Sequence, residues 1–154
     1  MDIALVDIPE RPVVAILHVG PYPLIGAAFD RLGDWAQRNA GVITGPPMAL
    51  YPDDSQTTAP DELRSYAALP IAPEASIDPG GTVERIAVAG GRYAVGAHHG
   101  GYAGLANAWQ EFMAAVAADG LDPDWSRSCF EVYANEPGTV PDDELITEMY
   151  QPIS

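Results

Sequence analysis

Residues 18–29, HVGPYPLIGAAF, recur as residues 98–109, HHGGYAGLANAW, with a histidine, a glycine, a tyrosine and an alanine in equivalent places and Phe29 matching Trp109. A second match follows in the same order: Tyr51, Thr57, 61–63 (DEL) and 70–71 (PI) correspond to Tyr133, Thr139, 143–145 and 152–153. Self-similarity at a nearly constant offset indicates a repeated structural unit. The chain therefore contains two copies of one module.

Each copy contains the same succession of elements. Residues 13–17 (VVAIL) form a β-branched run of strand length, and Gly20-Pro21 separates this run from apolar residues with helical spacing. We expect strands at 4–8, 13–17, 48–51, 63–71, 83–88, 93–97, 129–134 and 145–153, and helices from about 24 to 39 and 103 to 118. Gly90-Gly91 predicts a hairpin between strands 83–88 and 93–97, which strands 4–8 and 13–17 would match.

The 154 residues fit a single domain, 1–154, with half-modules at about 1–72 and 82–154 and a linker at 73–81. Halves of this size bury too little surface to be stable alone. We therefore expect an α+β fold, a tandem pseudo-twofold repeat of two strand-helix-strand-strand modules. Its antiparallel sheet of about eight strands would carry two helices on one face and a ligand groove on the other.

Composition excludes several classes of function. The chain has 22 acidic and 7 basic residues, a formal net charge of −15, which argues against binding to nucleic-acid backbones. No apolar stretch has the roughly 18 residues that a membrane-spanning helix needs. The first residues lack a basic signal-peptide region and Cys129 is the lone cysteine, so we expect a cytoplasmic protein that does not bind membranes.

Motifs for metals, cofactors and covalent catalysis are missing from the sequence. The adjacent His98 and His99 would face opposite sides of a strand and have no companion ligand motif, so we expect no metal site. The paired glycines at 90–91 and 100–101 do not form a dinucleotide fingerprint, and we expect no cofactor. Cys129 has no recognisable histidine or aspartate partner for nucleophilic catalysis.

Glu131 stands out among the acidic residues because apolar residues flank it in a strand. Alternation predicts that Phe130 and Val132 pack under the helices while Glu131 and Tyr133 lie on the open face. One interpretation is a solvated strand glutamate. The other is a partly desolvated carboxylate with a raised pKa, which would pair with a cation or act as an acid or base.

Aromatic residues gather in the same parts of the predicted fold. We expect Tyr133, Tyr150, Tyr22, Tyr102 and Trp109 to line a ligand site with Glu131, although Trp109 also fits the core stripe of its helix. Trp35 and Phe29 are assigned to the core. Aromatic faces beside a carboxylate favour a lipophilic cation, through cation–π contacts of roughly 0.5 to 2 kcal/mol each.

Four segments resemble the GyrI-like small-molecule-binding domain, also called the bacterial transcription-activator effector-binding domain. They are 11–22 (RPVVAILHVGPY), 91–95 (GRYAV), 99–102 (HGGY) and 130–137 (FEVYANEP), and the likeness covers nearly the whole chain. The resemblance implies tandem strand-helix-strand-strand modules and a pocket for bulky, lipophilic, cationic compounds at the module interface. The acid at its floor would be Glu131, with Tyr133 and Tyr150 as walls.

The resemblance also implies alternatives, because the family includes effector domains of regulators, DNA-gyrase inhibitors and hydrolases of cyclopropane-bearing genotoxic compounds. The modules use all 154 residues, so we expect no direct transcription control. We expect first a stand-alone binder of a lipophilic, cationic small molecule. The alternatives are a hydrolase, with Glu131 as the catalytic residue and Trp109 and Tyr102 beside it, and a protein partner of DNA gyrase whose acidic surface mimics nucleic acid.

Overall fold

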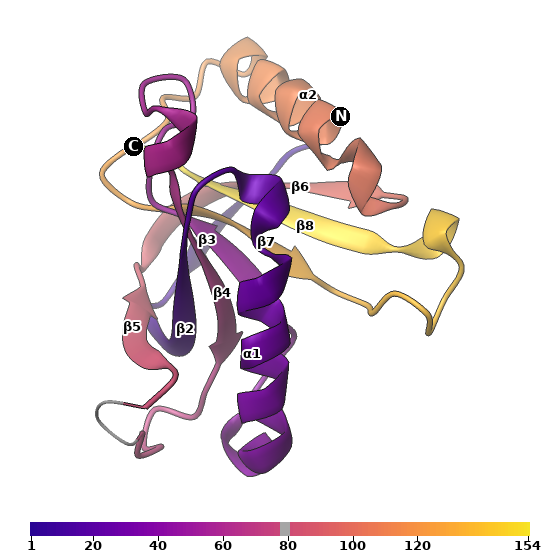
Figure 1. Ribbon diagram of the computed structural model, residues 1–154. Coiled ribbons are helices and arrows are strands. Elements are labelled where there is room, and N and C mark those ends of the chain that lie inside the picture. Colours follow the sequence, from indigo (N-terminus) through magenta and orange to yellow (C-terminus); the bar gives the residue numbers. More distant parts are fainter. Residues whose placement is uncertain (78–80) are drawn as a thin grey trace.

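The computed structural model describes residues 1–77 and 81–154, so residues 78–80 of the predicted linker lie outside the described part. Eight strands form one antiparallel sheet in the order β1-β6-β8-β7-β3-β4-β2-β5, with two long helices, α1 (Gly26–Arg38) and α2 (Leu105–Ala118) (Figure 1). The strands are β1 (Ala4–Ile8), β2 (Arg11–Val19), β3 (Met48–Tyr51), β4 (Arg64–Pro70), β5 (Glu84–Val88), β6 (Gly91–His99), β7 (Cys129–Tyr133) and β8 (Ile146–Pro152). The predicted α+β class is confirmed. No helix of the described residues is long and apolar enough to cross a membrane.

The two predicted hairpins are wrong, because the modules exchange a strand. β1 pairs with β6 and β5 pairs with β2, so each outer strand joins the sheet half of the other module. The two short connections pass close together: a Cβ on Gly90 would lie 2.7 Å from the backbone nitrogen of Glu10. The turn residues and the alternation of apolar residues would look the same whether a strand paired within its own module or with the other module. The sequence pattern therefore did not distinguish strand exchange from two hairpins.

Both helices cover the same face of the sheet. α1 packs Leu32 and Trp35 over β2 and β4, and α2 packs Phe112 and Val116 over β6 and β8. Cross-strand partners on that face run from Ala67 through Ala49 and Glu131 to Met149, which places these four residues on one side. Figure 1 shows α1 in purple and α2 in orange over different halves of the sheet.

The other face carries no α-helix of residues 1–77 and 81–154 and has its own apolar core; we call it the helix-free face. Its buried residues are Val13, Ala15, Met48, Leu50, Ala68, Val88, Tyr93, Phe130 and Val132. Phe130 and Val132 thus pack on the helix-free face, whereas the sequence predicted them beneath the helices. The alternation along β7 was correct and the assignment of its two faces was inverted.

Substitution of Gly96 tests how closely α2 approaches the sheet, and Gly33 in α1 provides the control. A Cβ on Gly96 would lie 2.7 Å from Cδ1 of the fully buried Phe112, whereas a Cβ on Gly33, inside α1, meets nothing within 4 Å. We expect Gly96→Ala to lower the free energy of unfolding by about 1–3 kcal/mol through overpacking. Gly33→Ala should raise it by about 0.5–1 kcal/mol through helix propensity. Urea unfolding measures both, and a Gly96→Ala variant as stable as the parent contradicts the close packing.

Candidate functional site

Glu131 lies near the centre of the sheet, on the helix-covered face. It is paired with Ala49 on one side and Met149 on the other, and it is only 4% exposed. The expectation that Glu131 lies on the helix-free face is wrong. The larger apolar neighbours Phe130 and Val132 fill the opposite core, which directs the carboxylate toward the space between the two helices.

Three neutral side chains donate hydrogen bonds to this carboxylate. The indole Nε1 of Trp109 donates to Oε1 at 2.6 Å, and the hydroxyls of Tyr51 and Tyr133 donate to Oε2 at 3.0 and 2.8 Å. Neither of the ion pairs found within residues 1–77 and 81–154 involves Glu131. A buried carboxylate is therefore stabilised here by neutral donors and has no cationic side chain as an ion-pair partner in the described part.

The two tyrosine donors are equivalent residues of the repeat. Tyr51 in β3 corresponds to Tyr133 in β7, and both hydroxyls reach the same oxygen from opposite directions along the paired strands. The residue equivalent to Glu131 is Ala49, its direct cross-strand partner. The pseudo-twofold axis therefore passes between Ala49 and Glu131, and one carboxylate serves both modules.

A second layer of aromatic rings follows the same symmetry. Tyr22 lies against Tyr51 with ring centres 4.7 Å apart, and its equivalent Tyr102 lies against Tyr133 at 5.4 Å. Phe29, equivalent to Trp109, contacts Tyr133 edge-on at 5.8 Å. We call the set formed by Glu131, Tyr51, Tyr133, Trp109, Tyr22, Tyr102 and Phe29 the Glu131 site.

Burial and the nearby carboxylate suppress ionisation of the side chains around Glu131. Burial, and then the charge of Glu131, raise the pKa of Tyr51 and of Tyr133 well above the usual value. Burial raises the pKa of Tyr22 to about 12. Burial, followed by the charge of Glu131, also raises the pKa of the Cys129 thiol to about 12. These tyrosines and the thiol are therefore neutral at pH 7.

Five of the six ligand-binding residues predicted from the sequence lie together. Trp109 and Tyr133 contact Glu131 directly, and Tyr22 and Tyr102 lie in the second layer. Tyr150 does not join them: it lies on the helix-free face, stacked on Phe130 with ring centres 4.5 Å apart and an interplanar angle of 11°. Tyr150 is the cross-strand partner of Phe130, so both side chains point to the same face of the sheet.

Sequence reasoning missed Tyr51 and treated Phe29 as core. The repeat carried the necessary signal, because Tyr51 is the equivalent of Tyr133 and Phe29 is the equivalent of Trp109. A ligand site on a pseudo-twofold axis draws equivalent residues from both copies. When a residue of one module is predicted near the axis, the equivalent residue of the other module should therefore be expected there as well.

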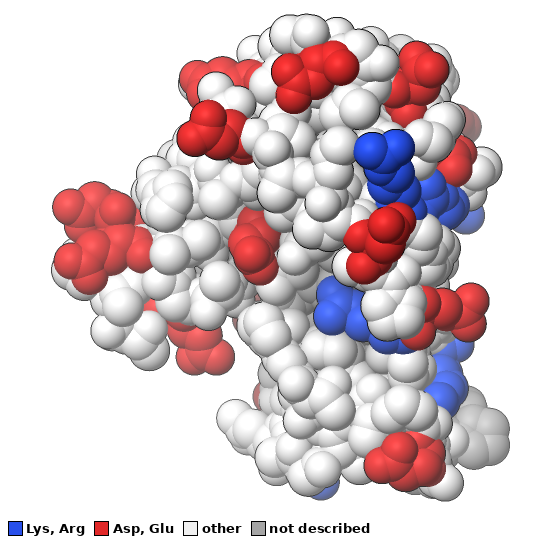
Figure 2. Space-filling view, turned by 180° about the vertical axis from the view of Figure 1, so that it is seen from behind, with Lys and Arg blue, Asp and Glu red and all other residues white. Residues whose placement is uncertain are grey.

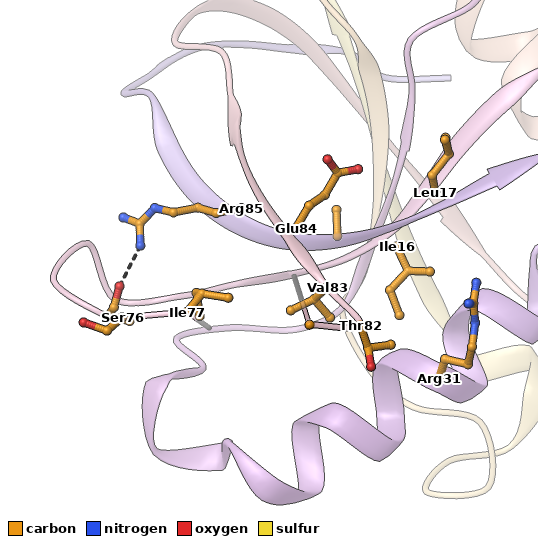
Figure 3. Close-up of a pocket in the computed structure, with 12 residues that line it drawn as sticks. Ile16, Leu17, Arg31, Ser76, Ile77, Thr82, Val83, Glu84 and Arg85 are labelled. Atoms are coloured by element: carbon orange, nitrogen blue, oxygen red, sulfur yellow. Dashed lines mark hydrogen bonds between the residues drawn. The ribbon is translucent and has the colours of Figure 1, made fainter. Parts of the chain in front are cut away.

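A separate hollow of about 810 Å³ lies between α1 and residues 75–77 and 81–85, away from Glu131 (Figure 3). Arg31 of α1 lines it, and Figure 3 shows Arg85 extending toward the neighbouring segment, where it donates to the carbonyl of Ala75 at 2.7 Å. Its lining among the described residues contains no aromatic ring. The hollow therefore does not share the chemistry of the Glu131 site.

Comparison with known proteins gives consistent matches over most or all of the chain. The model of the GyrI-like small molecule binding domain matches residues 1–154. A DNA gyrase inhibitor of Edwardsiella ictaluri (strain 93-146) is 32% identical over 140 residues, which cover 88% of each chain. EcmrR in its complex with DNA gives a TM-score of 0.79 at 19% identity, over 99% of this chain and 57% of that one. SAV2435 bound to tetraphenylphosphonium gives 0.69 at 14% identity, over 100% and 94%.

The raised tyrosine pKa values predict a loss of stability in alkali. Above about pH 10, the ordinary tyrosine pKa, Tyr51 and Tyr133 ionise in the unfolded chain but stay protonated in the folded one. The unfolded state is then favoured, so each tyrosine lowers the free energy of unfolding by about 1.4 kcal/mol per pH unit. Urea unfolding between pH 9 and 11 should show a shallower decline for Tyr51→Phe than for the parent. Identical slopes would contradict the buried, neutral state of Tyr51.

Proposed function

The chain belongs to the family of GyrI-like small molecule binding domains, and from this premise we propose that the Glu131 site binds a bulky lipophilic cation. The observation that carries the proposal is the buried carboxylate held only by neutral donors within the described residues. Removing a carboxylate from water is costly, and a cation in the same low-dielectric surroundings offsets that cost. A cationic ligand would supply the charge that the side chains around Glu131 do not.

The aromatic layer supports the lipophilic part of the ligand. Rings from both modules surround the carboxylate, and cation–π contacts would add roughly 0.5 to 2 kcal/mol each. Tyr102 is 40% exposed and marks the outer end of the layer, whereas Glu131 is buried. A ligand that spans from Tyr102 to Glu131 meets aromatic surface before it reaches the charge.

Access to Glu131 requires a side chain to move. The Trp109 indole donates to Oε1 at 2.6 Å and therefore occupies the approach from α2. A cation that contacts this oxygen must displace the indole and replace its hydrogen bond with an ionic contact. The displaced ring would then be available as a wall against the ligand.

Binding is a better match to this geometry than hydrolysis of a cyclopropane ring. A general base must lie within hydrogen-bond reach of the proton that it removes. Both oxygens of Glu131 already accept hydrogen bonds from aromatic side chains, so a substrate proton would have to compete with these donors. Hydrolysis with Glu131 as the base is the alternative, and turnover of a cyclopropane-bearing compound above an enzyme-free blank would establish it.

Replacing the charge of Glu131 while keeping its shape tests the proposal. Glu131→Gln should weaken tetraphenylphosphonium at least about tenfold, because the buried ionic contact is lost, while neutral triphenylphosphine oxide should lose no more than about twofold. Isothermal titration calorimetry measures both. Glu111→Gln on the exposed side of α2 is the matched control and should change neither affinity. An equal loss for the two compounds contradicts the charge role of Glu131.

Inhibition of DNA gyrase is a second candidate, favoured by the Edwardsiella ictaluri relative that carries this name. The net charge of −15 would suit a surface that competes with DNA for a basic groove. Excess protein should then reduce supercoiling by purified gyrase, and Glu131→Gln should inhibit equally, because that residue is buried. Supercoiling that is unchanged at excess protein would rule the candidate out.

A further inference from the structure

The two oxygens of the Glu131 carboxylate are not equally engaged. Oε2 accepts hydrogen bonds from the hydroxyls of Tyr51 and Tyr133, at 3.0 and 2.8 Å, whereas Oε1 accepts one hydrogen bond, from the indole of Trp109 at 2.6 Å. Each oxygen of a carboxylate has about two acceptor positions. Within residues 1–77 and 81–154, both positions of Oε2 are therefore filled, and Oε1 keeps one position without a donor.

Oε1 is also the oxygen that a ligand reaches with the smaller disturbance. Rings of the second layer lie against both tyrosine donors, with ring centres 4.7 Å apart at Tyr51 and 5.4 Å apart at Tyr133. A ligand that approaches Oε2 must displace two hydroxyls and the rings packed behind them. A ligand that approaches Oε1 displaces one indole, that of Trp109 on α2.

The chemistry of the ligand decides whether Oε1 regains a donor after the indole has moved. Glu131 is only 4% exposed, so little water can replace a lost donor there. A buried acceptor without a hydrogen-bond partner costs free energy, and a charged one costs more. A quaternary cation supplies a positive charge but no N–H. A protonated amine supplies both.

An N–H group also brings the positive charge closer to the carboxylate. An ammonium nitrogen that donates to a carboxylate lies about 2.7–2.9 Å from the oxygen. The indole nitrogen of Trp109 already lies at a similar distance, 2.6 Å, from Oε1. The methyl groups of a quaternary ammonium keep its nitrogen farther away, and the attraction between two charges falls with distance. The position of the indole nitrogen therefore suits the nitrogen of an amine.

We propose that the Glu131 site selects cations that carry an N–H donor, namely protonated amines attached to an aromatic body, over quaternary cations of similar size. This inference rests on the proposed function and narrows its class of ligand. The amine N–H would donate to Oε1 in place of the Trp109 indole, while Tyr51 and Tyr133 continue to donate to Oε2. Tetraphenylphosphonium has no N–H and would bind through its charge and its rings alone.

The acidic surface is a separate source of cation binding that the test must exclude. The chain has 22 acidic and 7 basic residues, and Figure 2 shows acidic side chains spread over the rear of the molecule, with arginines gathered along one side. Exposed carboxylates are hydrated, and salt screens their charge. They attract an amine and a quaternary cation by charge alone, so surface binding weakens in salt and does not discriminate between the two.

A matched pair of probes tests the selection. The first is N,N-dimethyl-1-naphthylmethylamine, which is protonated at pH 7, and the second is trimethyl(1-naphthylmethyl)ammonium, which carries a methyl group in place of the N–H. Isothermal titration calorimetry at about 0.15 M salt limits the contribution of the surface. The amine should bind about tenfold to a hundredfold more tightly, since hydrogen bonds between charged groups are the strong ones.

Variants and one NMR signal assign the preference to Glu131. Glu131→Gln should bring the two probes to within about threefold of each other, because a neutral acceptor forms the weaker hydrogen bond. Glu111→Gln on the exposed side of α2 should keep the preference of the parent. In the full ¹⁵N-labelled chain, the Nε1–H resonance of Trp109 should shift when the amine binds, because its hydrogen bond to Oε1 is replaced. Trp109→Phe removes this competing donor, so both probes should bind several-fold more tightly and the preference should remain.

The results separate this inference from the proposed function. Equal affinities of the two naphthyl probes for the parent overturn the selection for an N–H donor. If tetraphenylphosphonium then still binds and Glu131→Gln still weakens it, the proposed function stands without the inference. Failure of all three cations to bind overturns both. A preference that persists in folded Glu131→Gln, or that is lost in folded Trp109→Phe, also overturns the inference.

Discussion

The register between β3 and β7 is the constraint on which the rest of the structure depends. It places Ala49 opposite Glu131 and brings the hydroxyls of Tyr51 and Tyr133 to one carboxylate oxygen. A shift by one residue would turn Glu131 into the apolar core of the helix-free face, because side chains alternate along a strand. The buried carboxylate would then lose its hydrogen-bond donors. The observed register therefore provides hydrogen bonds for the side chain whose burial costs the most free energy.

Strand exchange joins the two modules in one sheet. β1 and β5 each complete the sheet half of the other module, so neither half carries all of its own strands. At the crossing, Gly90 lies so close to the connection between β1 and β2 that a side chain there would meet the backbone of residues 8–10. The carboxylate on the axis between the modules therefore lies within the shared sheet, and under the proposed function the part that must move for a ligand is a side chain, Trp109.

The sequence predicted the elements and the central residue of the site because both follow from local pattern. The repeat located the strands and helices, and the apolar flanks of Glu131 separated it from the other acids. Pairing of β1 with β6 and the choice of face for Phe130 depend on contacts between distant segments, which alternation leaves undecided. Tyr150 was assigned to the wrong face for the same reason. The register of β8 against β7 decides whether Tyr150 or Met149 lies on the same face as Glu131.

The two sides of β7 have opposite chemical character. Phe130 lies in the apolar core of the helix-free face, and the next residue, Glu131, is a carboxylate that accepts hydrogen bonds from three aromatic side chains. Because adjacent residues of a strand point to opposite faces, β7 alone contributes to both environments. The sheet of this duplicated fold thus presents an apolar core on one face and a hydrogen-bonded carboxylate among aromatic rings on the other.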